Sequence, residues 1–293
     1  MKNRANIIAS SVLTLGMLVS CTNENNINSR PINAIALVSG DFDHMGQTLD
    51  GLLLGYASYE GYICCAAYDP EINPDSNGLK EETLFTGTIN DGLGKELFLY
   101  DAVFLNSGAR GWGAWEYNGL EPDDGLINDL EAMENIREFV DRGGRLVLSD
   151  WTYDLVVALW PDKIDFFGDE AELDVAQVGV LAQINGTVSD ANLAEALGDE
   201  TVSLAYNYSN WSVIESVSDD VSVHISGDVT YRISASEGYG DLTDVPLLVS
   251  FTQGSGQVVF STFHWMAQNP DLGERIMLEV VEGLGRGFTG AGE

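Results

Sequence analysis

Short apolar runs typical of buried strands alternate with segments of helical spacing through the first half of this sequence. The run at 34–39 (Ala-Ile-Ala-Leu-Val-Ser) is apolar over nearly its whole length and ends at Gly40, as in a strand buried on both faces. Similar runs predict strands at 62–68, 100–106 and 145–150, and helical spacing predicts helices at 47–59, 128–141 and 152–159. This alternation predicts an α/β fold with a doubly wound, mostly parallel sheet and helices on both faces.

The pattern changes at about residue 175 to short alternating runs rich in Val, Thr, Tyr and Ser, which continue to residue 234. This composition predicts a β-rich insertion or subdomain, interrupted by one helical turn around 193–197. Beyond it, apolar runs at 247–251 and 257–262 flank a Gly-Ser-Gly turn and predict a hairpin. Residues 69–95 carry turn residues and predict a long loop or a small excursion.

Two helices have faces that can be assigned from spacing. Helix 128–141 is predicted to end at Gly143-Gly144 in the left-handed conformation. The last helix is predicted at 273–284. The predicted buried faces are Leu130, Met133, Ile136 and Val140 in the first, and Ile276, Leu278, Val280 and Val281 in the second.

The first 20 residues have the features of a targeting segment. Lys2 and Arg4 give a positive start, and the apolar stretch at 7–19 is shorter than the roughly 20 residues that span a bilayer. Leu-Val-Ser then precedes Cys21, where an ordinary cleavage site would show two small residues in A-x-A spacing. The segment resembles a bacterial lipoprotein signal, with an ordinary secretory signal peptide as the alternative. The resemblance implies cleavage before Cys21 and acylation of that cysteine.

We therefore expect Cys21 to anchor the protein to a lipid bilayer in the cell envelope, since two acyl chains suffice for stable anchoring. Thr22 rather than Asp follows the cysteine, and the resemblance then implies the outer membrane of a Gram-negative bacterium. Residues 21–31 are polar and predict a tether, which leaves 32–293 as the folded domain.

The charge balance excludes some partners. The chain has 46 acidic and 13 basic residues, for a formal net charge of -33. Nucleic acid and anionic lipid headgroups are poor partners for such a surface. A well-solvated acidic surface is the simplest explanation of the charge.

Metal sites and cofactors are not predicted. Cys64 and Cys65 are adjacent, so they form no disulfide framework, and no further cysteine or histidine completes a zinc set. Residues 73–78 (Asn-Pro-Asp-Ser-Asn-Gly) look like the start of a calcium loop. However, Leu84 stands where the bidentate Glu belongs, so a plain turn is favoured.

Three segments together resemble the class I glutamine amidotransferase-like group, including its ThuA-like relatives. They are the strand at 101–106 that enters a glycine-rich loop, the segment 139–148 in which a helix ends at a Gly pair before a strand, and the segment 256–264. The resemblance covers most of residues 32–293 apart from the β-rich insertion. It implies a flavodoxin-like sheet, a nucleophile on a sharp elbow after the fourth strand, and a histidine at the end of a later strand.

The residues at the implied elbow do not match that chemistry. Counting from the Gly pair places the elbow at Asp150, between Ser149 and Trp151, and no cysteine is there. His264 matches the family histidine in position, but Trp265 follows it in place of Pro. Without a thiolate or an activated hydroxyl no acyl-enzyme forms. The resemblance therefore implies a pseudoenzyme in which glutamine hydrolysis is lost.

Aromatic residues follow several predicted strand ends. Trp112, Trp115, Trp151 and Trp265 could converge on one rim of the sheet together with Asn106. There they would either fill the vacated site as core or present a surface that binds a sugar or peptide. We favour the filled site.

The predicted function is a non-catalytic, membrane-anchored domain that binds a ligand or partner protein in the cell envelope. One alternative is an envelope hydrolase that uses Ser149 or Asp150 with His264. A second alternative is a glycan-binding module that uses the tryptophan-rich rim.

Overall fold

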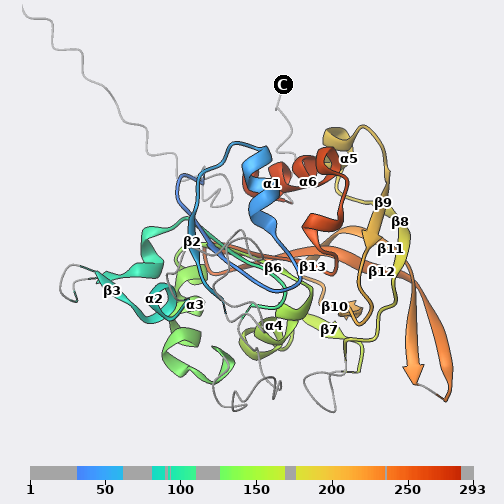
Figure 1. Ribbon diagram of the computed structural model, residues 1–293, viewed down its shortest axis with the longest axis horizontal. Coiled ribbons are helices and arrows are strands. Elements are labelled where there is room, and N and C mark those ends of the chain that lie inside the picture. The colour runs from blue at the N-terminus through green and yellow to red at the C-terminus, as the bar shows by residue number, and fades with distance from the viewer. Residues whose placement is uncertain are drawn as a thin grey trace, which may run out of the picture.

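A nine-stranded sheet runs through the centre of the protein, in the order β2-β1-β5-β6-β13-β12-β11-β8-β9 (Figure 1). The computed structural model describes residues 32–61, 81–89, 92, 94–109, 126–168, 176–234 and 236–284. The strands of this sheet are β1 (Ile35–Val38), β2 (Ala57–Tyr59), β5 (Ala102–Leu105), β6 (Arg145–Ser149), β8 (Ala182–Val188), β9 (Thr201–Tyr206), β11 (Val221–Ser234), β12 (Gly238–Gln253) and β13 (Gly256–Ser261).

The first five strands in this order run parallel to one another. When these five strands are numbered from 1 to 5 along the chain, their order across the sheet is 2-1-3-4-5. This is the strand order of doubly wound, flavodoxin-like sheets. Every residue of β1, β5 and β6 is buried, as expected for apolar strands covered on both faces. The predicted strands at 34–39, 100–106 and 145–150 and the mixed α/β fold are confirmed.

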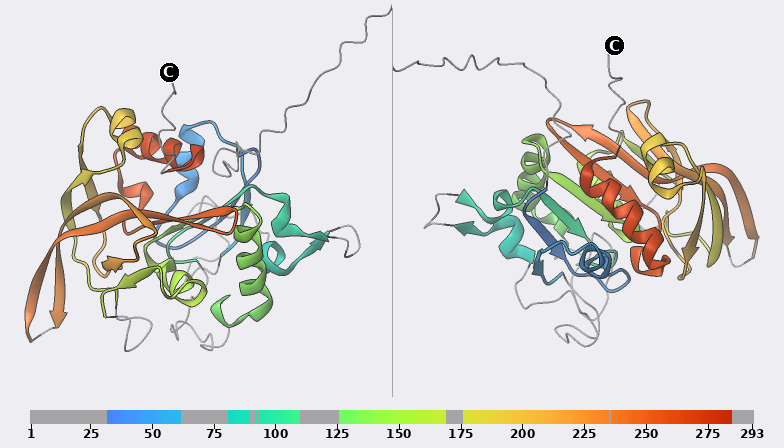
Figure 2. Two further views of the ribbon diagram at one scale, coloured as in Figure 1. Left: turned by 180° about the vertical axis from the view of Figure 1, so that it is seen from behind. Right: turned by 90° about the horizontal axis from the view of Figure 1, so that it is seen from above.

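The other four strands are antiparallel to their neighbours. β12 and β13 form the predicted hairpin, with Gln253 opposite Gly256. The β-rich region supplies β8, β9 and β11, which continue the central sheet on the far side of β12. It also supplies β10 (Ile214–Val217), which pairs with β7 (Ile164–Phe166) in a small separate sheet. The ends of β11 and β12 project together as a two-stranded arm (Figure 2).

Helices cover both faces of the sheet. Helices α1 (Met45–Gly51), α5 (Ala191–Leu197) and α6 (Pro270–Glu282) lie on one face, and their buried residues share one apolar cluster. Helices α2 (Glu81–Thr86), α3 (Leu130–Asp141) and α4 (Tyr153–Leu159) lie on the other face over a second cluster (Figures 1 and 2). None of the described helices is long and apolar enough to cross a membrane.

Helix α3 begins and ends as its sequence predicts. The carboxylate of Asp129 accepts hydrogen bonds from the amides of Glu131 and Ala132. At the other end Gly143 has φ +111°, in the left-handed region that favours glycine. The prediction that Leu130 is buried is wrong, because this first helical residue is 77% exposed.

Helix α6 packs through Ile276, Met277, Val280 and Val281. The prediction that Leu278 is buried is wrong: this side chain is 41% exposed, and Met277 lies on the buried face instead. The guanidinium of Arg145 on β6 donates to the carbonyls of Val280 and Val281 near the end of the helix. A buried cation there satisfies terminal carbonyls and complements the helix dipole.

One prediction between the first and third strands is wrong. The helix expected over 47–59 ends at Gly51, because Leu53 takes φ +58° and is 92% exposed, and the chain then forms β2. Of the two alternatives for 69–95, the small excursion agrees with the described residues, which contain α2 and a short hairpin of β3 (Thr88–Ile89) and β4 (Gly94–Lys95). The strand predicted at 62–68, with Cys64 and Cys65, lies outside the described residues.

Candidate functional site

Polar side chains gather where β1, β5, β6 and β13 end. In a parallel sheet the carboxyl ends of the strands share one edge, and doubly wound folds place their sites there. The residues at these ends include Ser39, Asn106, Ser149 and His264, all of them buried. The candidate site is built from these side chains and from the loops that follow the strands.

Asp150 occupies a sharp elbow between β6 and α4. Its φ is +46°, a conformation that non-glycine residues rarely adopt, and a single 3₁₀ turn (Asp150–Thr152) leads into the helix. A strained strand-to-helix turn of this kind presents the nucleophile in elbow-type hydrolases. The chain therefore forms the elbow at Asp150, but with a carboxylate on it.

The Asp150 carboxylate is fully engaged by neighbouring groups. Its Oδ2 lies 2.8 Å from Nε2 of His264, and its Oδ1 accepts a 2.7 Å hydrogen bond from the amide of Ser212. The Ser107 hydroxyl lies 3.5 Å from Oδ2, and the Ser212 hydroxyl donates to the backbone carbonyl of Asp150. Asp150 is 1% exposed and His264 is 5% exposed. The two side chains form a buried pair between the ends of β6 and β13.

His264 is held between acceptors on both ring nitrogens. Its Nδ1 lies 3.2 Å from Oδ1 of Asn207, and its Nε2 faces Asp150. Burial lowers the pKa of His264, but the hydrogen bond and negative charge of Asp150, helped by the charge of Asp43, outweigh burial and raise it above 6.5. Two facing acceptors suit an imidazolium, which donates from both nitrogens. The contacts with Asp150 and Asn207 therefore favour the protonated form of His264 over the neutral one.

In the part of the chain that the structure describes, the Ser149 hydroxyl is hydrogen-bonded to neither Asp150 nor His264. Its hydroxyl is fully buried and accepts a 3.0 Å hydrogen bond from the amide of Ser107. Ser107 in turn accepts from the amide of Trp151 through its own hydroxyl. Ser149 therefore links the end of β6 to the loop after β5.

Asn106 has a bridging role at the end of β5. Its side-chain amide donates to the carbonyl of Val38 at 3.0 Å, and its side-chain oxygen accepts from the amide of Met45 at 2.7 Å. These two contacts tie β5 to the end of β1 and to the start of α1. Because the side chain is buried, Asn106 shapes the site and is not exposed to a ligand.

Asp43 holds the loop after β1 against the segment after β13. Its carboxylate accepts from the amides of His44, Trp265 and Met266 at 2.9–3.1 Å. Burial lowers the pKa of the adjacent His44; the Asp43 charge opposes this shift and the His264 charge adds to it.

An aromatic cluster lies beside the buried pair. The rings of Phe42 and Trp151 pack edge to face at 4.7 Å, and Tyr208 contacts both Phe42 and His264. The Trp151 indole donates a 2.7 Å hydrogen bond to the carbonyl of Asn210. Phe42 and Trp151 are partly exposed and Tyr208 is exposed. We call these three residues the aromatic cluster.

Trp265, another predicted ligand residue, does not join this cluster. Trp265 is 1% exposed and packs against Phe263 at 5.3 Å in the core under α1 and α6. It therefore fills the interior and does not contribute to an exposed rim. Trp112, Trp115, Cys21 and the loop at 73–78 lie outside the described residues.

Several residues of the site were missed by sequence reasoning. They are Phe42, Asp43, Ser107, Asn207, Tyr208 and Ser212. Asn207 and Ser212 lie in the β-rich region, and no local pattern links them to a strand end more than 50 residues away. Phe42 and Asp43 carried a usable signal, because they lie two and three residues after Gly40, which ends the first strand.

A second buried histidine lies at the other end of the sheet. Nδ1 of His224 lies 2.9 Å from Oδ2 of Asp190, and Nε2 lies 2.8 Å from the Ser250 hydroxyl. Gln257 donates both to Ser250 and to the carbonyl of Leu284. Ser250 lies within β12 and is 3% exposed. We therefore assign Asp190, His224, Ser250 and Gln257 to the core, as a buried hydrogen-bond network.

Comparison with known proteins gives structural likeness only. The sequence matches no protein-family model and no curated protein. Solved structures similar to this chain include the mmIFT52 N-terminal domain (10% identity, TM-score 0.49, covering 89% of this chain and 99% of that one). They also include a protein assigned as a GMP synthase component from Thermoplasma acidophilum (11% identity, TM-score 0.47, covering 86% of this chain and 94% of that one). PurLQS from Thermotoga maritima is a third (10% identity, TM-score 0.46, covering 84% of this chain and 96% of that one).

Proposed function

We propose that this protein is a non-catalytic domain that binds a ligand or a partner protein in the cell envelope, anchored to the bilayer through acylated Cys21. The outer membrane of a Gram-negative bacterium is the proposed location. The anchor is supported by the sequence at 18–21, and the lack of catalysis by the chemistry of the elbow.

One observation carries the non-catalytic proposal. Asp150 stands at the elbow, yet both of its carboxylate oxygens are hydrogen-bonded and the side chain is 1% exposed. A nucleophile must present a free lone pair to a substrate, and a general base must be able to take up a proton. Asp150 is occupied by His264 and Ser212, and the two ring nitrogens of His264 are occupied by Asp150 and Asn207. These groups suit a structural ion pair.

The aromatic cluster supports a glycan as a second candidate ligand. Partly exposed Phe, Trp and Tyr rings offer apolar faces that pack against the C–H groups of a sugar ring. Because Trp265 is buried, the platform would consist of Phe42, Trp151 and Tyr208. The hydrolase alternative uses the same place but requires Asp150 or Ser149 to react.

One titration separates these candidates. Purified protein is mixed with chitotetraose or p-nitrophenyl acetate, while tryptophan fluorescence and product release are followed. We expect no product from either compound above the level of His264→Gln, because Ser149 and Asp150 are both buried and hydrogen-bonded. Fluorescence that changes with chitotetraose in the wild type but not in Trp151→Ala would support the glycan platform. Turnover that is lost in both Asp150→Asn and His264→Gln would establish the hydrolase and overturn our proposal.

The lipid anchor gives a separate expected result. In a Gram-negative host the wild-type chain should sediment with the membrane fraction, and mass spectrometry should find acyl chains on Cys21. Cys21→Ser should release the protein from the membrane, since two acyl chains supply the stable anchoring. Cys64→Ser, which leaves the signal intact, is the matched control. Membrane association that persists in Cys21→Ser would contradict the anchor.

A further inference from the structure

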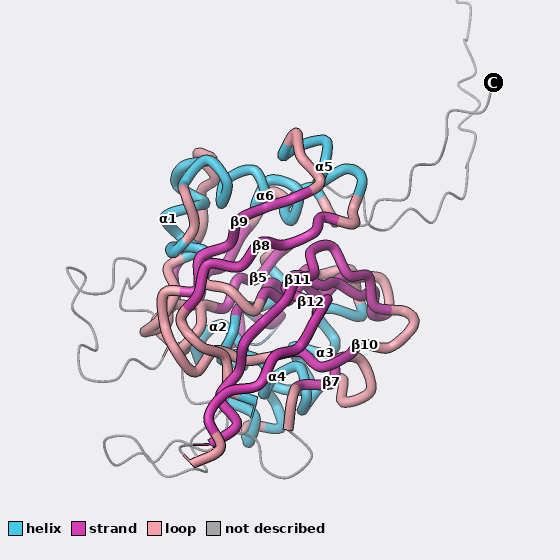
Figure 3. The backbone as a smooth tube through the Cα atoms, turned by 90° about the vertical axis from the view of Figure 1, so that its right-hand side faces the viewer, coloured by secondary structure: helices cyan, strands magenta, loops and turns pink. Residues whose placement is uncertain are grey.

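The strand β9 forms one edge of the nine-stranded sheet, and among the described residues no strand pairs with its outer side (Figure 3). This edge is capped on either side of Ser203: the Gln268 side chain donates to the carbonyl of Ala205 and accepts from its amide, and the Asp199 carboxylate accepts from the amide of Thr201. In an antiparallel strand, alternate residues direct their backbone groups to the same side. Ser203, two residues before Ala205, therefore directs its N–H and C=O to the same outer edge.

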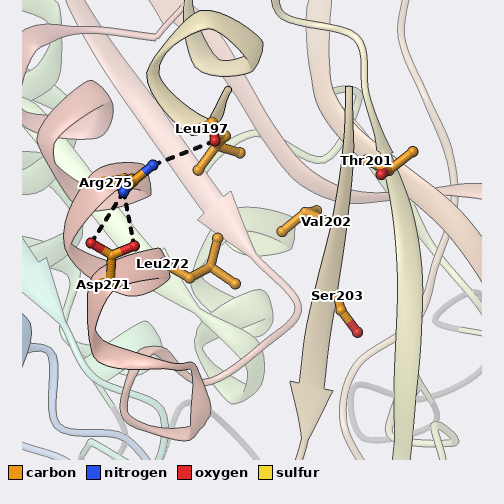
Figure 4. Close-up of a pocket in the computed structure, with 7 residues that line it drawn as sticks. All are labelled: Leu197, Thr201, Val202, Ser203, Asp271, Leu272 and Arg275. Carbon is orange, nitrogen blue, oxygen red and sulfur yellow. Dashed lines mark hydrogen bonds and ion pairs between the residues drawn. The ribbon is translucent and has the colours of Figure 1, made fainter. Parts of the chain in front are cut away.

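A hollow of about 240 Å³ lies along this part of β9 (Figure 4). Its walls are β9 and helix α6, and the last residue of α5 closes one end. Val202, Leu272 and Leu197 give it apolar walls. Arg275 pairs with Asp271 at 3.0 Å and donates to the carbonyl of Leu197. The outward backbone groups of Ser203 thus border an open space and not a packed helix.

The charge around this hollow is mainly negative. Asp199 and Glu200 lie in the turn between Leu197 and Thr201, and both are exposed. Hydrogen bonds from the Thr201 hydroxyl and amide lower the pKa of Asp199, which keeps its carboxylate ionised. Arg275 is already neutralised by Asp271. Together with the chain's net charge of -33, this disfavours a second copy of the protein and favours a basic occupant.

We propose that the outer edge of β9 binds an extended, lysine- or arginine-bearing segment of a partner protein by strand addition. Backbone hydrogen bonds to Ser203 would supply the pairing, and one apolar side chain of the segment would enter the hollow between Val202 and Leu272. A basic side chain at the end of the segment nearest Thr201 would meet Asp199 and Glu200. This surface is distinct from the aromatic cluster, so the proposal does not depend on the ligand bound there.

The test uses a short fluorescein-labelled peptide of alternating lysine and valine, mixed with the full chain. We expect binding by fluorescence anisotropy and slower hydrogen exchange at the amide of Ser203. Ser203→Pro, which removes the outward N–H, should weaken binding at least about tenfold, and Ser203→Ala, which keeps it, should bind as the wild type does. Glu200→Lys should also weaken binding, because it reverses one of the rim charges.

Two control peptides make the result decisive even if Ser203→Pro disturbs the fold. A lysine–valine peptide methylated on every backbone nitrogen, so that neither edge can donate a hydrogen bond, should not bind. A glutamate–valine peptide should bind much more weakly than the lysine–valine peptide. If the methylated peptide bound as tightly as the unmethylated lysine–valine peptide, strand addition would be overturned. If the glutamate–valine peptide bound as tightly, the basic character of the partner would be overturned. No binding by the lysine–valine peptide would overturn the proposal as a whole.

Discussion

Replacing Asp150 by Asn is expected to lower the free energy of unfolding by about 3–5 kcal/mol at about pH 6. The change removes the carboxylate that faces Nε2 of His264 at 2.8 Å and leaves a buried imidazolium without its counter-ion. Asn tolerates the left-handed conformation that φ +46° requires, so the substitution tests the charge and not the backbone. Urea unfolding followed by circular dichroism would measure the change.

Two variants serve as controls for this result. Asp150→Ala should cost about 1 kcal/mol more than Asp150→Asn, because alanine is strained in the left-handed region. Asp165→Asn removes an exposed carboxylate that accepts only a hydroxyl from Ser216 at 3.0 Å, and should change stability by less than about 0.5 kcal/mol. An Asp150→Asn protein as stable as Asp165→Asn would show that the pair contributes nothing to the fold.

The same pair sets a pH dependence. The folded pKa of His264 lies above its ordinary value of 6.5, so the folded state holds this proton more tightly than the unfolded state does. The resulting stability is fully present below pH 6.5 and is lost as the pH rises through the raised folded pKa. Unfolding curves at a series of pH values should show this loss in the wild type and not in His264→Gln. Parallel profiles for the two proteins would contradict the ion pair.

Replacing Gly40 by Ala is expected to destabilise the protein by about 3 kcal/mol and to disturb the candidate site. A Cβ on Gly40 would lie 2.3 Å from the carbonyl oxygen of Ser107, 2.7 Å from that of Asn106 and 2.9 Å from the amide of Ala109. All three neighbours are backbone atoms, so the loops after β1 and β5 must move apart. Denaturation would measure the stability, and the fluorescence of Trp151 would report the displaced loop.

Gly55 is the matched control for this substitution. Nothing lies within 4 Å of a Cβ built there, and its φ is not in the left-handed region. Gly55→Ala should therefore be neutral or slightly stabilising, through the reduced entropy of the unfolded chain. If Gly40→Ala behaved like Gly55→Ala, the close approach of the loops after β1 and β5 would not be required by the fold.

Strong local signals made much of the parallel half of the sheet predictable. β1, β5 and β6 are short runs of apolar residues with every position buried, and such runs have few other stable arrangements. The end of α3 was predictable for a similar reason, since Gly143 occupies a conformation that few other residues adopt. Counting from that Gly pair was enough to place the elbow at Asp150.

Local patterns failed where a tertiary contact overrides them. Apolar spacing continues beyond Gly51, but the chain leaves the helix there and forms β2 beside β1. Leu278 has helical spacing in α6 and is still exposed, because only the face with Met277 meets the sheet. Strand pairing and helix docking depend on surfaces that are far apart in the sequence, which no short window contains.

The sequence by itself determined that a carboxylate, Asp150, follows the fourth apolar strand, and that a histidine follows a later strand. Only the tertiary structure decided what these two residues do. Asp150 and His264 are 114 residues apart, and the sheet brings them to 2.8 Å because β6 and β13 are neighbouring parallel strands. The β-rich region then adds Ser212 and Asn207, which occupy the remaining hydrogen-bonding positions. Buried polar groups are costly when they lack partners, so the pair depends on contacts from segments that are far from it in the sequence.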